Sequence, residues 1–196
     1  MFEKTIKAFL FIIFSIFYRV EIIGKENVPQ KGAALMCSNH VSEMDMLLFG
    51  YRINRLIRYM AKEELFKNPL FGAIIKNLGA FPIKRGTGDI GSIKTALRLL
   101  EDGHIVGIFP QGTRTKKKDV KEVKVKAGAA LLAQKSGVPI LPVAISGKTT
   151  PFSKIKIVFG KPFTLDLDKN KKYTSNELLT ESENIMNRIY SLMEES

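Results

Sequence analysis

Residues 33–45 read AALMCSNHVSEMD, an apolar run that ends at a polar loop. The first six letters contain no charge and do not alternate apolar with polar, which is typical of a strand covered on both faces of its sheet. Apolar letters return after the loop with the spacing of a helix. The stretch therefore predicts a strand, a loop and a helix of an α/β protein.

The same alternation continues along the chain. We predict further strands at 19–24, 55–61, 80–84, 104–110, 138–146 and 154–163, and helices at 42–52, 67–79, 90–103, 127–137 and from Ser175. This order is typical of a single α/β domain whose largely parallel, mixed sheet is flanked by helices. Ligands of such sheets bind at the carboxyl ends of strands, so the loops after Ser38, Ile83 and Phe109 are the candidate site.

Residues 1–18 form the most hydrophobic segment. Its apolar part is shorter than the roughly 20 residues of a membrane span. On a helix, one side would carry a wide apolar face and the other the residues Glu3, Lys4, Lys7, Ser15, Tyr18 and Arg19. We predict an amphipathic helix lying in a membrane interface; the alternative is a helix packed on the protein core. The predicted division is a membrane-associating helix at 1–18 and a folded domain at 19–196.

The charge of the chain indicates an anionic partner. It carries 31 basic and 19 acidic residues, a net charge of +12, which favours nucleic acid, an acidic membrane or a phosphorylated substrate. No helix-turn-helix or RNA-binding signature accompanies it, so nucleic acid is disfavoured. The single cysteine, Cys37, excludes an intramolecular disulfide. Two histidines and one cysteine lack metal-ligand spacing, so no metal site is expected.

His40 has two interpretations. Asp45 lies five residues later, and if His40 is in the loop and Asp45 in the first helical turn, the carboxylate can fix the tautomer of an imidazole base. Alternatively, Ser42 and Asp45 form a capping-box-like pattern and His40 is incidental. The residues alone leave both open.

Two other loops are basic. Lys84 and Arg85 precede a helix, and Arg114 follows the strand ending at Pro110. Arginine beside free backbone N–H groups suits a phosphate; solvated basic loops are the alternative. The pattern Gly86-x-Gly88-x-x-Gly91 resembles a dinucleotide fingerprint, but the next strand has no acidic residue to hold a ribose.

Taken together, these loops resemble the lysophosphatidic acid acyltransferase family. NHVSEMD matches its histidine–aspartate motif, GAFPIKR its second motif, FPQGTR its third and VPILPVAI its fourth, in order, from the strand after the first helix to about Phe163. MAKEELF resembles the segment between the first two motifs, which adds Lys62. One position departs from the pattern, because the family's third motif usually has glutamate where this chain has Gln111.

The resemblance implies an enzyme of phospholipid biosynthesis. It would transfer a fatty acyl group from acyl-CoA or acyl carrier protein to the sn-2 hydroxyl of lysophosphatidic acid, giving phosphatidic acid. His40 would be the base and Asp45 would orient it, while Arg85, Arg114 and Lys62 would bind the acceptor's phosphate. The motif-supporting residues are Asn39, Gln111, Gly112 and Thr113. No cofactor is expected beyond the acyl donor.

The expected partner surface is an anionic membrane, with the protein peripheral or monotopic on the cytoplasmic face of the cell membrane. Two alternatives remain: an acyltransferase with another acceptor, such as glycerol 3-phosphate or a lysophospholipid, and a non-catalytic protein that binds anionic membranes. Substitution of His40 separates the last of these from an enzyme.

Overall fold

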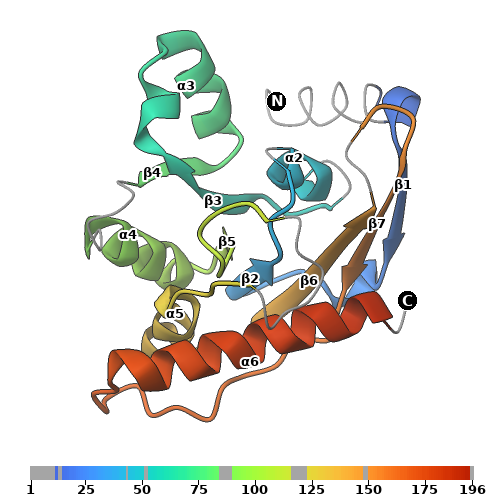
Figure 1. Cartoon of the computed structure of the whole chain (residues 1–196). Helices are drawn as coiled ribbons and strands as arrows, with labels where there is room; N and C mark the ends of the chain where they lie inside the picture. The colour runs from blue at the N-terminus through green and yellow to red at the C-terminus, as the bar shows by residue number, and fades with distance from the viewer. Residues whose placement is uncertain are drawn as a thin grey trace.

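The computed structural model describes residues 12, 15–42, 44–50, 53–83, 90–115, 123–147 and 150–194 (Figure 1). They contain a seven-stranded sheet of order β1-β7-β6-β2-β5-β3-β4. The strands are β1 (Arg19–Ile23), β2 (Ala34–Ser38), β3 (Ile57–Lys62), β4 (Ala80–Ile83), β5 (Ile105–Ile108), β6 (Ile140–Gly147) and β7 (Lys154–Phe159). All neighbouring pairs are parallel except β6 and β7. The predicted fold class, a largely parallel mixed sheet, is confirmed.

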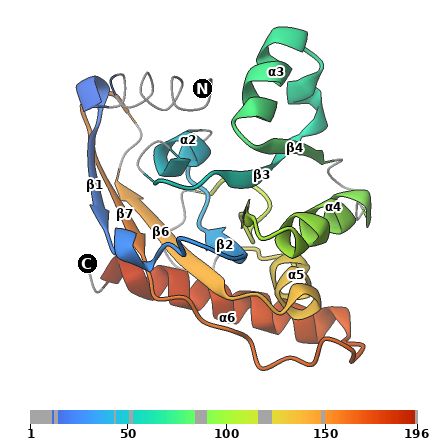
Figure 2. The same ribbon diagram turned by 180° about the vertical axis from the view of Figure 1, so that it is seen from behind.

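Helices cover both faces of the sheet. They are η1 (Lys25–Asn27), α2 (Asp45–Gly50), η2 (Glu63–Phe66), α3 (Pro69–Asn77), α4 (Ile90–Glu101), α5 (Gly128–Ser136) and α6 (Ser175–Glu194). Figures 1 and 2 show α4, α5 and α6 on one face and α2 on the other. The core accordingly consists of two apolar clusters, one on each side of the sheet.

β2 explains why the sheet is buried on both sides. All five of its residues are buried, and successive side chains enter opposite clusters: Leu35 and Cys37 pack with α4, α5 and α6, whereas Ala34 and Met36 pack on the side of α2. This alternation follows from the period of two along a strand. An unbroken apolar run was therefore the correct signal for a central strand.

Three expectations differ from the structure or lie outside it. α2 begins at Asp45 rather than at Ser42, because the Asp45 carboxylate holds the preceding backbone in a loop. Residues 15–17 are helical, but 1–11, 13 and 14 lie outside the described residues, so the interfacial helix stays a prediction. Tyr18, expected on a polar side, is buried and its hydroxyl donates to Met44 Sδ. Among the helices in the described segments, none is both long and apolar enough to cross a membrane.

Candidate active site

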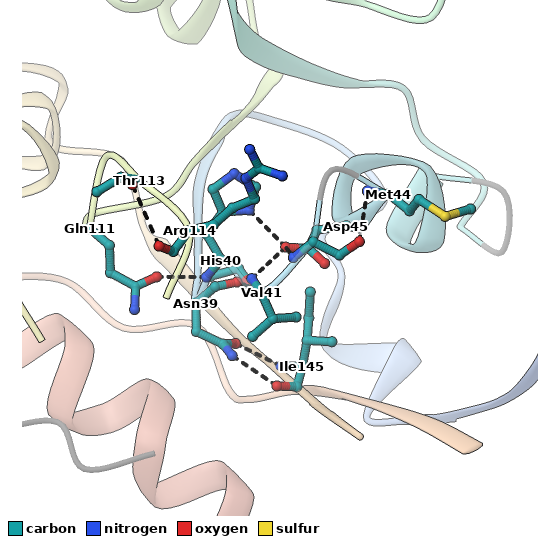
Figure 3. Close-up of polar contacts among 11 residues, drawn as sticks. Asn39, His40, Val41, Met44, Asp45, Gln111, Thr113, Arg114 and Ile145 are labelled. Atoms are coloured by element: carbon teal, nitrogen blue, oxygen red, sulfur yellow. Dashed lines mark hydrogen bonds and ion pairs between the residues drawn. The ribbon is translucent and has the colours of Figure 1, made fainter. Parts of the chain in front are cut away.

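His40 and Asp45 are in contact at the carboxyl end of β2. His40 Nδ1 lies 2.7 Å from Asp45 Oδ2, and both side chains are buried. The same carboxylate oxygen accepts hydrogen bonds from the backbone N–H groups of Val41 and Ser42, at 2.8 and 2.9 Å (Figure 3). An oxygen that accepts two N–H groups is an acceptor toward the ring as well, so Nδ1 donates and Nε2 is left to take a proton.

The capping interpretation is also present in the structure. Ser42 Oγ accepts from the backbone N–H of Met44 at 3.2 Å, while Asp45 reaches back to the N–H of Ser42. The second of these contacts is that of a capping box, whereas in the first the Ser42 hydroxyl bonds the N–H of Met44 rather than that of Asp45. The two interpretations therefore do not compete, because the turn that starts α2 is what brings Asp45 to His40.

Two further contacts fix the His40 loop. The imidazole stacks on the Phe109 ring, with centroids 3.9 Å apart and planes inclined by 12°. The His40 carbonyl accepts from the backbone N–H of Thr115 at 2.9 Å. Phe109 belongs to the third motif but was not predicted as a site residue. The signal was its place directly after β5, the strand paired with β2.

Asn39 holds the loop to the other neighbour of β2. Its side-chain amide exchanges two hydrogen bonds with the backbone of Ile145 in β6, Nδ2 to the carbonyl at 2.8 Å and Oδ1 from the N–H at 2.7 Å. Asn39 is buried, so the side chain satisfies backbone groups that water cannot reach. These two bonds tie the His40 loop to β6, and the supporting role of Asn39 in function stays a prediction.

Gln111 contacts the backbone of His40 itself. Its Oε1 accepts from the His40 N–H at 2.6 Å, and its Nε2 donates to the Tyr190 hydroxyl of α6 at 3.4 Å. Gln111 is 2% exposed. The amide thus provides the acceptor that a glutamate would provide and directs its N–H₂ group toward a hydroxyl oxygen. Sequence reasoning missed Tyr190, which sits on the apolar face of α6.

The third loop continues from Gln111 to exposed residues. Gly112 has φ 66° and its N–H donates to the Phe109 carbonyl, which closes a tight turn; this left-handed conformation favours glycine. Thr113 and Arg114 follow and are exposed. The turn therefore places the Arg114 guanidinium at the carboxyl ends of the parallel strands, where His40 also lies.

The remaining predicted cations differ in what the structure describes. Lys62 is the last residue of β3 and is exposed. β2, β5 and β3 are parallel neighbours, so their carboxyl ends lie together. Lys62 therefore lies at the same end of the sheet as His40 and Arg114. Arg85 lies outside the described residues. The described part of the chain contains no group of three or more histidine, cysteine or acidic side chains arranged to hold a metal.

Two buried groups near the site are held in their neutral forms. Burial raises the pKa of the Cys37 thiol far above its ordinary value, in keeping with an inert core cysteine. Burial, and secondly the Asp45 carboxylate, hold the pKa of the Tyr59 phenol well above its usual range. Tyr59 therefore stays protonated near the Asp45 carboxylate, and sequence reasoning gave no sign of this residue.

Comparison with known proteins identifies relatives in sequence and in fold. The family model described as "Acyltransferase" matches residues 19–146. A 1-acyl-sn-glycerol-3-phosphate acyltransferase of Bacillus subtilis is 36% identical over 157 residues, which are 77% of this chain and 77% of that protein. One from Borreliella burgdorferi is 29% identical over 145 residues, 72% of this chain and 56% of that protein.

A solved structure has the same fold. The crystal structure of the 1-acyl-sn-glycerophosphate acyltransferase PlsC from Thermotoga maritima aligns with a TM-score of 0.73 and 26% identity, over 98% of this chain and 79% of that one. The match to the family model covers more than half of the chain, and it includes the His40–Asp45 loop and the Arg114 loop. This chain belongs to the acyltransferase family.

Proposed function

We propose that this protein transfers a fatty acyl group from a thioester, acyl-CoA or acyl carrier protein, to the sn-2 hydroxyl of 1-acyl-glycerol 3-phosphate, giving phosphatidic acid. The observation that carries the proposal is the 2.7 Å contact between His40 Nδ1 and Asp45 Oδ2. This contact lies at the carboxyl ends of the parallel strands, where Arg114 also lies. The names of the Bacillus and Borreliella relatives support this choice of acceptor.

The chemistry follows from the orientation of the imidazole. His40 Nε2 takes the proton of the acceptor hydroxyl as its oxygen attacks the thioester carbonyl carbon. The tetrahedral intermediate collapses and the carbon–sulfur bond breaks. The leaving sulfur takes the proton from His40 and departs as a thiol. Asp45 stabilises the positive charge on the ring between these two transfers. The acceptor supplies the nucleophile and the thioester the leaving group, so we propose that no cofactor takes part.

Cations at the same end of the sheet would position the acceptor. We assign its phosphate to Arg114, with Lys62 and, by its place after β4 in the sequence, Arg85. A guanidinium binds a phosphate through two parallel hydrogen bonds. Holding the phosphate fixes the distance from the sn-2 hydroxyl to His40, and such positioning supplies much of a two-substrate rate enhancement.

The direct test uses the purified full-length chain with lysophosphatidic acid and a panel of acyl-CoA and acyl carrier protein donors. We expect phosphatidic acid to form with at least one donor class. Glycerol 3-phosphate and a lysophospholipid with a diester head group are the competing acceptors. A higher kcat/KM on either of these would overturn the assignment of acceptor while leaving the transfer chemistry in place.

Replacing Arg114 by alanine tests the phosphate contact. We expect KM for lysophosphatidic acid to rise about tenfold or more, because a hydrogen bond to a charged group contributes about 1.5–3 kcal/mol. Steady-state kinetics with monoacylglycerol, which lacks the phosphate, should show no such change. Arg98→Ala, which removes an exposed arginine from α4, is the matched control. Equal losses on both acceptors would contradict a phosphate-binding role.

We further propose that the protein is peripheral on the cytoplasmic face of the cell membrane and that residues 1–18 contact the lipid. Ile16 and Phe17 are exposed, and the Phe17 ring contacts that of Phe152, with centroids 5.9 Å apart. Phe152 is 72% exposed and has φ 64°, which is unusual for a bulky residue. An exposed aromatic ring in such a conformation supports a role in lipid contact.

Changing Phe152 to asparagine tests this contact without disturbing the turn, since asparagine tolerates positive φ. Burying a phenylalanine side chain contributes about 1.5–3 kcal/mol, so binding to anionic vesicles should weaken about tenfold or more in a sedimentation assay. Ile23→Ser, at the other end of β1, also removes an exposed apolar side chain and serves as control. Equal binding by the Phe152 variant and the wild type would count against the contact.

A further inference from the structure

Large exposed apolar side chains are concentrated in two places. Nine are exposed among the described residues, and four of these belong to the start of the chain and the Phe152 turn. Three more, Leu65, Leu70 and Phe71, lie on η2 and α3, which leaves only Ile23 and Ile90 elsewhere. Leu70 is 75% exposed. Grouped apolar residues on a surface indicate an interaction site, whereas scattered ones do not.

The η2–α3 hairpin (residues 63–77) is internally fixed. Asn68 caps α3 by accepting from the Phe71 N–H at 3.0 Å, and Pro69 is the first helical residue. Gly72 packs so closely on η2 that a Cβ there would lie 2.9 Å from the Phe66 carbonyl oxygen. The cap and the close packing of Gly72 hold η2 against α3, and the exposed side chains project from this packed pair.

The charge of α3 and the residues just before it, in contrast to that of η2, favours an anionic surface. Residues 67–77 contain two lysines, Lys67 and Lys76, and no acidic residue; both lysines are exposed. The acidic residues of the hairpin, Glu63 and Glu64, are confined to η2. Apolar side chains flanked by lysines are the composition of elements that lie in a lipid interface.

The hairpin is placed where a lipid substrate would approach. In both views α3 and the start of β1 lie at the end of the molecule opposite α6, and α2 lies between them (Figures 1 and 2). Asp45 is the first residue of α2, so the His40 loop also lies between the two apolar groups. A flat surface that touched both groups would face the proposed site.

We propose that the η2–α3 hairpin is a second membrane contact, in which Leu65, Leu70 and Phe71 enter the interface of an anionic bilayer and Lys67 and Lys76 meet its head groups. The inference rests on the proposed function, because it explains how the acyl-transfer site is presented to a lipid acceptor. A second copy of the chain fits less well: three such side chains cover at most a few hundred Å², below the about 800 Å² per partner of a stable interface.

The test uses the full-length protein with Leu70 and Phe71 both replaced by serine. Binding to vesicles of phosphatidylglycerol and phosphatidylcholine should weaken about tenfold or more in sedimentation. The rate on long-chain lysophosphatidic acid in vesicles should fall in parallel, and the rate on a short-chain, monomeric acceptor should stay within about twofold of wild type. Ile90→Ser, which removes an exposed apolar residue from α4, should change none of these. Thermal unfolding by circular dichroism checks that the fold is kept.

A second variant tests the charge. Lys67→Gln with Lys76→Gln should weaken binding to phosphatidylglycerol vesicles and leave the weak binding to pure phosphatidylcholine unchanged. Combining the serine pair with Phe152→Asn should weaken binding beyond either variant, as expected for two separate contacts. Wild-type vesicle binding by the serine pair would overturn the proposal. So would a change from dimer to monomer in light scattering with unchanged vesicle binding, which would assign the hairpin to a second copy.

Vesicle binding requires no turnover, so this inference and the proposed function can fail separately. If the wild type binds vesicles through the hairpin but forms no phosphatidic acid, the proposed reaction is wrong and the membrane contact stands. If the wild type is active and the serine pair is unaltered in binding and in vesicle-dependent rate, the reaction stands and the hairpin contact is wrong.

Discussion

Replacing His40 by alanine is expected to lower kcat by about three orders of magnitude with little change in KM for either substrate. A positioned general base contributes about 10²–10⁴-fold, and the described surroundings of the ring serve to position it. Asp45 Oδ2 fixes Nδ1 at 2.7 Å, and Phe109 fixes the plane of the ring. In the proposed arrangement the cations and the lipid contacts hold the substrates, so substrate binding should survive the loss of His40. Single-turnover rates with saturating donor measure the effect on chemistry directly.

His104 provides the matched control, because it is the only other histidine of the chain. It precedes β5 at the opposite end of that strand from Phe109, and His104→Ala should retain full activity. His40→Phe keeps an aromatic ring against Phe109 and removes both nitrogens, so it separates loss of packing from loss of the base. If the phenylalanine variant, correctly folded by circular dichroism, kept wild-type turnover, His40 could not be the base.

Most of the fold could be predicted from local pattern. Unbroken apolar runs marked β2, β5 and β6, which are buried on both faces, and helices of amphipathic spacing marked α4 and α6. The order of the strands could not be predicted. Sequence neighbours such as β2 and β3 are separated by β5 in the sheet, and this arrangement is set by long-range packing that no local window contains.

The pairing of His40 with Asp45 was predictable in part, because both ends of the contact lie in one loop and one helical turn. The partners from distant segments were not. Asn39 reaches Ile145, and Gln111 reaches Tyr190, across 106 and 79 residues of sequence. Phe109 stacks on His40 only because β5 lies beside β2. Such contacts depend on strand order, so a motif can name the residue and still leave its partner unknown.

Gln111 is the position at which the chain departs from the usual motif, and its replacement has the second large expected effect. Gln111→Leu keeps a similar volume but removes the acceptor of the His40 N–H. A buried N–H left without a partner costs about 1–3 kcal/mol, and the loop can avoid this cost only by moving the imidazole away from its productive position. We expect kcat to fall about tenfold to hundredfold.

Gln111→Glu should behave differently. Glutamate keeps an oxygen acceptor for the His40 N–H, and the Tyr190 hydroxyl, which accepts from Gln111 Nε2 in this structure, can rotate and donate to the new carboxylate. Turnover should therefore stay within about threefold of wild type. Measured side by side, the leucine and glutamate variants decide what this position contributes. If the glutamate variant keeps its activity and the leucine variant loses it, the hydrogen-bond acceptor matters and the negative charge does not. A large gain with glutamate would mean that the charge acts on the reaction, and that the natural glutamine slows this enzyme.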